Sequence, residues 1–258
     1  MNTQILPRLL LSVAMVATAA LASPRADAAQ PAPVAARNVV LVHGAWADGS
    51  SWAEVIPRLQ EAGLNVIAVQ NPLSSLEDSV AATRRALALQ DGPTVLVGHS
   101  WGGTVISEAG TDPKVSALVY VAARAPDAGE DFVALAGRFL AGPARAGIQT
   151  RDGYTRLSED AFLRHFANGV APAQARELYA VQGETATSLF GARTTVAAWR
   201  ERPSFYVVAR DDQTIDPGLE RFLAKRMDAT TIEVDAGHLA MVSHPREVAD
   251  LILRAAGR

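Results

Sequence analysis

A serine inside a glycine-bounded pentapeptide is the residue whose setting most clearly suggests chemistry. Residues 98–102 read Gly-His-Ser-Trp-Gly and directly follow the apolar run of residues 94–97. A serine at a sharp turn between a buried strand and a helix holds its hydroxyl clear of the backbone, where a base can reach it. Glycines at both ends suit a turn too tight for a Cβ atom. The pentapeptide alone is common by chance, so the strand-then-helix context carries the prediction that Ser100 is a nucleophile.

Serine needs a general base within hydrogen-bond reach, and that base needs an orienting group. Among the five histidines, His238 comes just after a predicted strand and after Gly237, which lets the loop turn back toward the serine. We predict that His238 is the base. His99 is part of the turn and should point away from substrate, His165 lies on a predicted helix, and His244 precedes a helix-starting proline.

Aspartates after two of the predicted strands are candidates for the orienting group. Asp211 and Asp212 both follow the fifth strand, and the residues alone leave the choice between them open. Asp216 begins the next helix, where a carboxylate is ordinarily a cap. Asp127, after the fourth strand, is the alternative from elsewhere in the chain.

Acyl transfer also requires N–H donors for a developing oxyanion, each worth about 2.7–4 kcal/mol in the transition state. The backbone N–H of Trp101, next to the nucleophile, is one predicted donor. The loop after the first strand reads His43-Gly44-Ala45-Trp46. Gly44 allows close approach of the backbone, so the N–H of Ala45 is the predicted second donor. The plain alternative is that this loop is only a tight strand exit.

Alternating strands and helices must position these residues. We predict strands at 38–43, 65–70, 94–99, 115–122, 204–209 and 230–234, and helices at about 50–62, 75–90, 101–110, 216–227 and 245–256. This order predicts an α/β fold with a mainly parallel six-stranded sheet flanked by helices. Reacting groups in such sheets lie at the carboxyl ends of the strands, where the candidates fall.

The segment 123–203 interrupts this alternation. It has helical patterning at 160–167, at 171–181 and near 194–200, and no convincing strand. An insertion of this length is too long for a plain loop. We therefore predict a helical cap, inserted after the fourth strand, that covers the strand ends.

Composition limits the possible partners. The chain has 258 residues, 49% of them hydrophobic, with a formal net charge of -3 and no cysteine. These values predict one domain over residues 38–258, no disulfide, and neither nucleic acid nor an anionic membrane as a partner. The oligomeric state is not readable.

The first residues have the pattern of an export signal. Arg8 is followed by the apolar stretch 9–22, and residues 20–22 and 26–28 both read as A-x-A cleavage sites. We predict a signal peptide over 1–28, a flexible lead-in over 29–37, and an exported protein, periplasmic or secreted. The apolar run is shorter than the roughly 20 residues that a membrane span requires, so no stable membrane association is expected.

Four stretches together resemble a known family. Residues 42–46, 98–103, 212–217 and 237–241 are similar to motifs of the α/β-hydrolase superfamily, and the resemblance runs from about 38 to 254. The most similar members are small single-chain esterases related to plant methyl-ester esterases and hydroxynitrile lyases. The resemblance implies the α/β-hydrolase fold, a sheet that begins at the family's third strand, and no cofactor or metal. Its D-x-T-I-x-P motif favours Asp212 over Asp211.

The same resemblance separates esterase from lyase. The similar lyases carry a threonine after the first-strand histidine and a lysine after the catalytic histidine, whereas this chain has Gly44 and Leu239. Without that lysine no cation holds a leaving cyanide, so the sequence favours a serine esterase. Relatives that attack haloalkanes or epoxides use an aspartate nucleophile, which Ser100 argues against. Acyl transfer to another nucleophile, perhydrolysis, and a non-catalytic ligand-binding protein are the alternatives.

The substrate is predicted only coarsely. We expect an apolar small-molecule ester of small or medium size in an apolar pocket, with Trp46, His43 and Leu239 as candidate contacts. Arginines of the insertion would suit an acidic substrate, but an arginine there is ordinarily a solvated one.

Overall fold

A computed structural model describes residue 1 and residues 35–258 of the chain. The predicted signal peptide and most of the predicted lead-in lie outside the described residues. The last residues of that lead-in belong to the folded body. The N–H of Ala36 donates to the carbonyl of Ala256 at 2.9 Å, and the N–H of Arg37 donates to the carbonyl of Pro93 at 3.2 Å.

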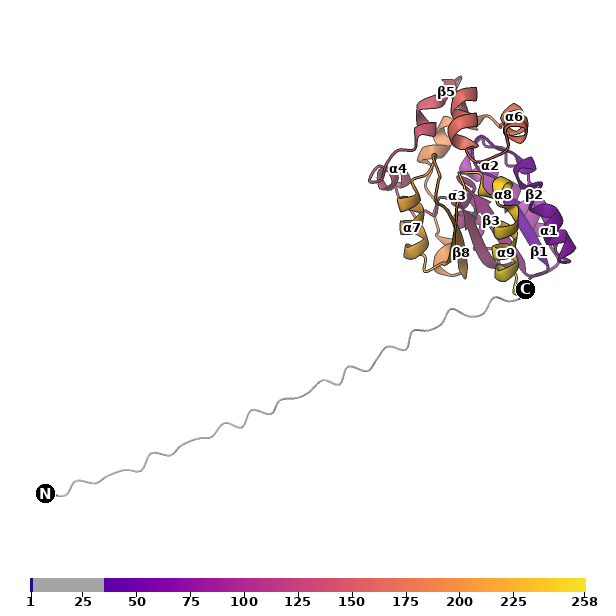
Figure 1. The fold of residues 1–258 in the computed structure, drawn as a ribbon. Coiled ribbons are helices and arrows are strands. Elements are labelled where there is room, and N and C mark those ends of the chain that lie inside the picture. Colours follow the sequence, from indigo (N-terminus) through magenta and orange to yellow (C-terminus); the bar gives the residue numbers. More distant parts are fainter. Residues whose placement is uncertain (2–34) are drawn as a thin grey trace. The chain divides into compact units, whose positions relative to one another are not determined.

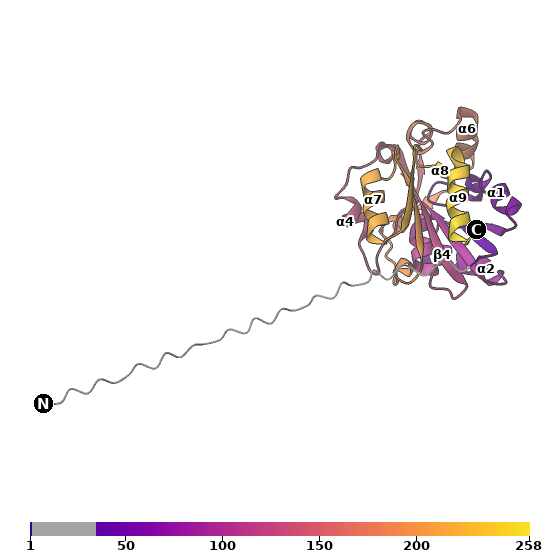
Figure 2. The ribbon, with the colours of Figure 1, turned by 60° about the horizontal axis from the view of Figure 1, so that its bottom comes forward.

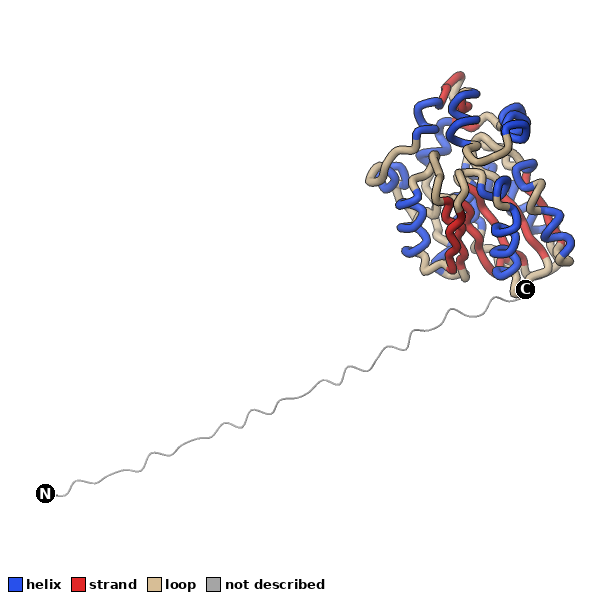
Figure 3. The backbone as a smooth tube through the Cα atoms, viewed as in Figure 1, coloured by secondary structure: helices blue, strands red, loops and turns tan. Residues whose placement is uncertain are grey.

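Six parallel strands form the main sheet, in the order β2-β1-β3-β4-β8-β9 (Figures 1 and 3). They are β1 (Asn38–Val42), β2 (Asn65–Val69), β3 (Thr94–His99), β4 (Val115–Val121), β8 (Ser204–Ala209) and β9 (Thr230–Val234). The predicted strands are confirmed to within one residue at each end. All residues of β1 and β3 are buried, as their uninterrupted apolar runs predict for strands covered on both faces.

Helices cover both faces of this sheet. They are α1 (Ile56–Glu61), α2 (Leu76–Ala88), α3 (Gly102–Ala109), α7 (Pro217–Arg226), α8 (Ala240–Ser243) and α9 (Pro245–Ala255). Figure 2 shows α1 and α9 on one side of the sheet and α7 on the other. No helix in the described part of the chain is long and apolar enough to cross a membrane.

The predicted helix over 50–62 is wrong as a single element. A 3-10 helix, Gly49–Trp52, comes first, and α1 begins only at Ile56. The Asp48 side chain accepts the N–H of Ser50 and caps the 3-10 turn. Pro57 starts α1 separately, because proline fits the first turn of a helix but not its interior.

The insertion after β4 is not purely helical, which corrects the predicted cap. It contains α4 (Phe132–Ala136), α5 (Glu159–Ala161), a π-helix (Phe162–Phe166), α6 (Pro172–Ala180) and 3-10 turns, but also β5 (Ile148–Arg151), β6 (Tyr154–Leu157) and β7 (Thr185–Ala186). These three strands form an antiparallel sheet. Asp152 and Gly153, both at positive φ, make the β5–β6 turn. An Asp-Gly pair is a hairpin signal that the sequence reading missed.

The strand order places the reactive loops together. The chain reverses its direction of travel across the sheet between β1 and β3, and crevices form at such switch points. The loops after β1, β3, β4, β8 and β9 leave from one edge of the sheet, toward the insertion at the top of Figure 1. The candidate residues therefore meet at this edge.

The contact between α3 and the β4 exit leaves no room for a Cβ atom at Gly103. A Cβ there would lie 2.0 Å from the carbonyl oxygen of Arg124. Alanine ordinarily stabilises a helix by about 1 kcal/mol relative to glycine. We expect Gly103→Ala instead to lower the free energy of unfolding by about 1–3 kcal/mol, because overpacking outweighs helix propensity.

Urea unfolding measures this difference. Gly191→Ala is the matched control, since nothing lies within 4 Å of a Cβ at Gly191. A Gly103→Ala protein as stable as the parent, or more so, would contradict the tight packing of the turn.

Candidate active site

Ser100 occupies a strained turn between β3 and α3. Its φ is +52°, in the left-handed region that few non-glycine residues adopt. Its N–H donates to the carbonyl of Val121 at 3.2 Å, and its carbonyl accepts the N–H of Gly103 at 3.1 Å. A Cβ at Gly44 would lie 2.6 Å from the Ser100 Cβ, and one at Gly98 only 2.7 Å from the carbonyl oxygen of Gly102. The surrounding backbone therefore fixes where the hydroxyl points.

Ser100, His238 and Asp212 are joined by a chain of hydrogen bonds. His238 Nε2 lies 2.8 Å from Ser100 Oγ, and His238 Nδ1 lies 2.6 Å from Asp212 Oδ2. The His238 ring is fully buried. Gly237 is needed next to it, because a Cβ there would lie 2.3 Å from the carbonyl oxygen of Asn168. Three residues far apart in sequence thus form one hydrogen-bonded chain in the order Ser-His-Asp, which we call the relay.

The other candidate aspartates have different partners. Asp211 is exposed, and the hydrogen bonds found for it among the described residues involve its backbone: its N–H donates to the carbonyl of Ala236 at 3.0 Å, and its carbonyl accepts a hydrogen bond from Asn168. Asp127 pairs with Arg200, and Asp216 caps α7 by accepting the N–H groups of Gly218 and Leu219. Among the four, only Asp212 contacts His238. Its other oxygen accepts the N–H groups of Thr214 at 2.6 Å and Ile215 at 2.9 Å, which stabilise its charge.

The predicted oxyanion donors flank Ser100. Gly44 lies directly against the serine, as the contact above shows, and Ala45 follows it. Neither the Ala45 nor the Trp101 amide donates to another backbone group within residues 35–258. Both N–H groups therefore lack a backbone acceptor among the described residues, as an oxyanion donor requires.

His43 differs from its predicted role as a substrate contact. The ring is buried, with Nε2 2.8 Å from the backbone nitrogen of Asn71 and Nδ1 2.9 Å from the carbonyl of Gly44. The amide of Asn71 can only donate, so Nε2 accepts and Nδ1 carries the proton. Burial lowers the pKa of His43, which keeps this neutral form. Both ring nitrogens thus bond backbone groups, and the ring orients the Gly44–Ala45 peptide.

Trp46 ties the oxyanion loop to the insertion. Its backbone N–H donates to Thr185 Oγ1 at 3.0 Å, and its indole N–H donates to Thr155 Oγ1 at 3.1 Å. Its ring centroid lies 5.3 Å from that of Phe190. Leu239, the other candidate contact, is buried directly before α8.

Two rings flank the His238 imidazole. The Phe166 ring, from the π-helix, lies 5.1 Å away, and the His99 ring lies 4.7 Å away. His99 Nε2 lies 3.0 Å from the His238 carbonyl, whereas His99 Nδ1 has no partner within the described part of the chain. Burial and then the His238 charge hold the pKa of His99 well below its usual range. His99 is therefore a neutral donor that positions the loop.

His165, in the same π-helix, pairs with Gln213, and His244 bonds with Ser243. Neither contacts the relay. Sequence reasoning did not assign Phe166 to it, and the only available signal was its place on a predicted helix of the insertion.

Glu220 is a site residue that sequence reasoning missed. It lies fully buried on α7, where its Oε2 accepts the N–H of Ala209 at 2.9 Å. Burial and the Asp212 charge raise the pKa of Glu220 well above its usual range. The available signal was its position in the apolar i, i+3, i+4 pattern with Leu223 and Ala224.

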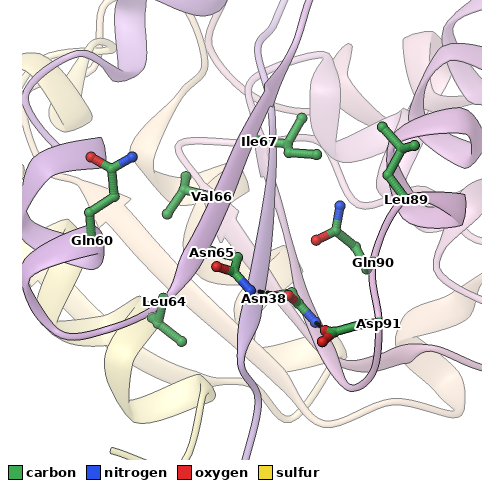
Figure 4. A pocket seen from close by; sticks show the side chains of 9 residues that line it. All are labelled: Asn38, Gln60, Leu64, Asn65, Val66, Ile67, Leu89, Gln90 and Asp91. Carbon is green, nitrogen blue, oxygen red and sulfur yellow. Dashed lines mark hydrogen bonds between the residues drawn. The ribbon is translucent and has the colours of Figure 1, made fainter.

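A separate hollow lies at the opposite ends of the strands. It is lined by the first residues of β1 and β2, Asn38 and Asn65, and by residues such as Gln60 and Asp91 (Figure 4). Asn38 donates to Asp91 Oδ1 at 3.2 Å, and Asn65 donates to Asn38 Oδ1 at 3.1 Å. These side chains bond one another at the amino ends of β1 and β2, away from Ser100.

Comparisons with known proteins identify the family of the chain. The profile of the alpha/beta hydrolase family matches residues 39–251. The carbendazim hydrolyzing esterase of Nocardioides sp. (strain SG-4G) is 26% identical over 248 residues, covering 83% of this chain and 97% of that protein. Methylesterase 2 of Arabidopsis thaliana is 23% identical over 252 residues, covering 85% and 96%. The crystal structure of a pyrethroid hydrolase gives a TM-score of 0.73 at 23% identity, covering 86% and 98%.

The match extends over almost the whole folded body. It includes the strands that carry the candidate residues, and a plant methylesterase is among the similar proteins, as the motifs imply. The chain is a member of the alpha/beta hydrolase family.

Proposed function

We propose that the protein is a carboxylic ester hydrolase in which Ser100, His238 and Asp212 form the catalytic triad. The observation that carries the proposal is the unbroken relay, with 2.8 Å from Ser100 Oγ to His238 Nε2 and 2.6 Å from His238 Nδ1 to Asp212 Oδ2. The names of the similar proteins, which include an esterase and a methylesterase, support the same reaction.

The reaction takes two steps. Ser100 Oγ attacks the ester carbonyl while His238 Nε2 accepts its proton, and the N–H groups of Ala45 and Trp101 hold the oxyanion. His238 then protonates the leaving alcohol, which leaves an acyl-enzyme on Ser100. Water, activated by His238, attacks the acyl carbon and releases the acid. Asp212 holds the imidazole tautomer and stabilises the imidazolium.

The charge of Asp212 depends on Glu220. Two buried carboxylates side by side repel strongly, so one of them keeps a proton. Asp212 accepts two backbone N–H groups and faces His238, whereas Glu220 Oε1 has no hydrogen-bond partner among residues 35–258. A proton on Glu220 Oε1, shared with Asp212, satisfies that oxygen. Glu220 is therefore the neutral member of the pair, next to the Asp212 charge.

The alternatives use the same residues or lack a needed one. A cyanohydrin lyase of the similar type needs a cation after the catalytic histidine, where this chain has buried Leu239. Acyl transfer and perhydrolysis would proceed through the same acyl-enzyme, and the products formed with competing nucleophiles separate them from hydrolysis. The substrate in this proposal is a small or medium ester, taken up by an exported enzyme.

Ser100→Ala tests the nucleophile. Removing Oγ leaves no atom to form the acyl-enzyme, so kcat for para-nitrophenyl acetate should fall by about 10⁴-fold or more. Labelling by a fluorophosphonate probe should disappear with it, as read by intact-protein mass spectrometry. Ser50→Ala, at an exposed serine, is the control and should keep both activities. Parent protein that takes up no label and turns over no ester would indicate a non-catalytic binding protein.

Glu220→Gln tests the neutral carboxyl through stability. Glutamine can accept the Ala209 N–H and donate to Asp212 without any charge. Because the pKa of Glu220 is raised by folding, the parent takes up a proton on folding and loses stability as pH rises through the interval above the unfolded-state pKa. Glutamine removes that loss. The stability of Glu220→Gln relative to the parent should therefore increase from about pH 5 to about pH 8, by at most about 1.4 kcal/mol per pH unit.

Urea unfolding across this pH range measures the difference in unfolding free energy between Glu220→Gln and the parent. Glu233→Gln is the control of opposite sign, because Arg221 and Arg210 lower the pKa of Glu233 to about 2. Its carboxylate stabilises the fold throughout this range, so that variant should be less stable than the parent by a constant amount. If the difference in unfolding free energy between Glu220→Gln and the parent does not change with pH, Glu220 is ionised in the folded protein.

A further inference from the structure

Arg124 lies beside the nucleophile, at the carboxyl end of β4. Its backbone N–H donates to the carbonyl of Ser100 at 3.0 Å, and its own carbonyl is packed against Gly103 of α3. Arg124 thus leaves the sheet at the same edge as Ser100, His238 and the oxyanion loop. The proposed mechanism does not use it.

The guanidinium group is held between two aromatic rings. Its Cζ lies 4.7 Å from the centroid of the Phe132 ring and 5.7 Å from that of Phe190. Among the side-chain donors, only Nη1 makes a hydrogen bond to a described residue, the carbonyl of Phe190 at 3.3 Å. The side chain is half-buried, so its other N–H donors remain accessible to a ligand.

Within residues 35–258, no carboxylate neutralises this cation. No ion pair within the described residues includes Arg124, and burial is the one cause that lowers its pKa, to about 10. It remains positive at neutral pH. Arg226, which is also partly buried and near the β4 exit, shows the ordinary arrangement, with Glu130 at 2.7 Å. An arginine that is desolvated without a counter-ion destabilises the free protein, and a bound anion would remove that cost.

An aromatic contact connects Arg124 to the oxyanion loop. The Phe190 ring that Arg124 touches also lies 5.3 Å from the Trp46 ring, and Trp46 directly follows the proposed donor Ala45. The Trp101 indole donates to the carbonyl of Leu189, so the segment before Phe190 is fixed against the nucleophile turn. Arg124 and the oxyanion loop therefore lie on either side of one apolar residue.

This arrangement suits an ester with a charged end. The ester carbonyl would lie at Ser100, a short apolar chain would lie along Phe190 and Trp46, and a carboxylate would reach the guanidinium. A guanidinium can bind a carboxylate through two parallel hydrogen bonds, which fixes orientation as well as charge.

Building on the proposed ester hydrolase function, we propose that Arg124 binds a carboxylate of the substrate, so that the preferred substrates are monoesters of short dicarboxylic acids. The proposal keeps the small or medium size expected above, but it replaces the expected apolar ester with one that carries a second, anionic group on the acyl side.

Two matched esters test it. Mono-para-nitrophenyl glutarate carries a terminal carboxylate, and para-nitrophenyl pentanoate has the same chain length with a neutral end. The parent should show a higher kcat/KM on the glutarate ester. Arg124→Met should lower the glutarate-to-pentanoate ratio of kcat/KM by about 10- to 100-fold, the usual effect of one charged hydrogen-bonded contact, and leave the pentanoate rate within about 3-fold. Arg124→Lys should restore part of the ratio, since it keeps the charge but loses the planar fork.

Stability and a control variant separate binding from structure. Arg124→Met should unfold at the same or a higher urea concentration than the parent, because methionine fits between rings without a buried charge. Arg200→Met removes an exposed cation that stacks on Trp199 and should leave the ratio unchanged.

An unchanged ratio in Arg124→Met, or an equal loss on both esters, would overturn the carboxylate role while the parent still hydrolyses pentanoate. If the parent hydrolyses neither ester, the proposed function is instead overturned.

Discussion

The left-handed backbone of Ser100 is the constraint on which the site depends. Such a conformation costs about 1–3 kcal/mol for a residue with a side chain, and it persists only where the surroundings enforce it. Here the Ser100 carbonyl accepts two N–H groups, one from α3 and one from Arg124 at the β4 exit. Glycines on three sides let the backbones approach closely enough for these bonds. The same bonds that present the hydroxyl to His238 therefore also fix the start of the segment that carries Arg124.

The ionisable side chains packed around Ser100, His238 and Asp212 are neutral. His43 and His99 are both neutral because burial lowers their pKa values, and each ring is bonded to a backbone group that it orients. Glu220 is neutral because it is buried next to Asp212. Asp212 is then the one full charge beside His238 among these neighbours. An imidazolium that forms during the reaction meets a single carboxylate, without a competing cation or anion within the relay.

Much of this arrangement follows from local sequence pattern, and the rest does not. The strands of the main sheet are predictable because runs such as 39–42 are apolar without interruption, and turns such as Asn71-Pro72 end them. The hairpin of β5 and β6 escaped prediction because its strands are short, largely exposed and set among helical segments. Asp211 and Asp212 are adjacent in one loop, and the local pattern does not show which of them faces His238. Only the family motif favoured Asp212. The Glu220–Asp212 and Arg124–Phe190 contacts are tertiary, and no spacing in the sequence encodes them.

Glu220 and Arg124 show two responses to the same physical problem. Each is a desolvated ionisable side chain near the proposed triad, without a partner of opposite charge among the described residues. A carboxyl can avoid the buried charge by holding a proton, as Glu220 does. The cost is a loss of folding stability as pH rises. A guanidinium cannot avoid its charge, because even with a pKa near 10 it stays charged at neutral pH. Among the described residues no anion pairs with it, so a bound anion is what would relieve the cost. Since the accessible donors of Arg124 lie next to the ring that borders the oxyanion loop, the molecule best placed to bring that anion is the substrate itself.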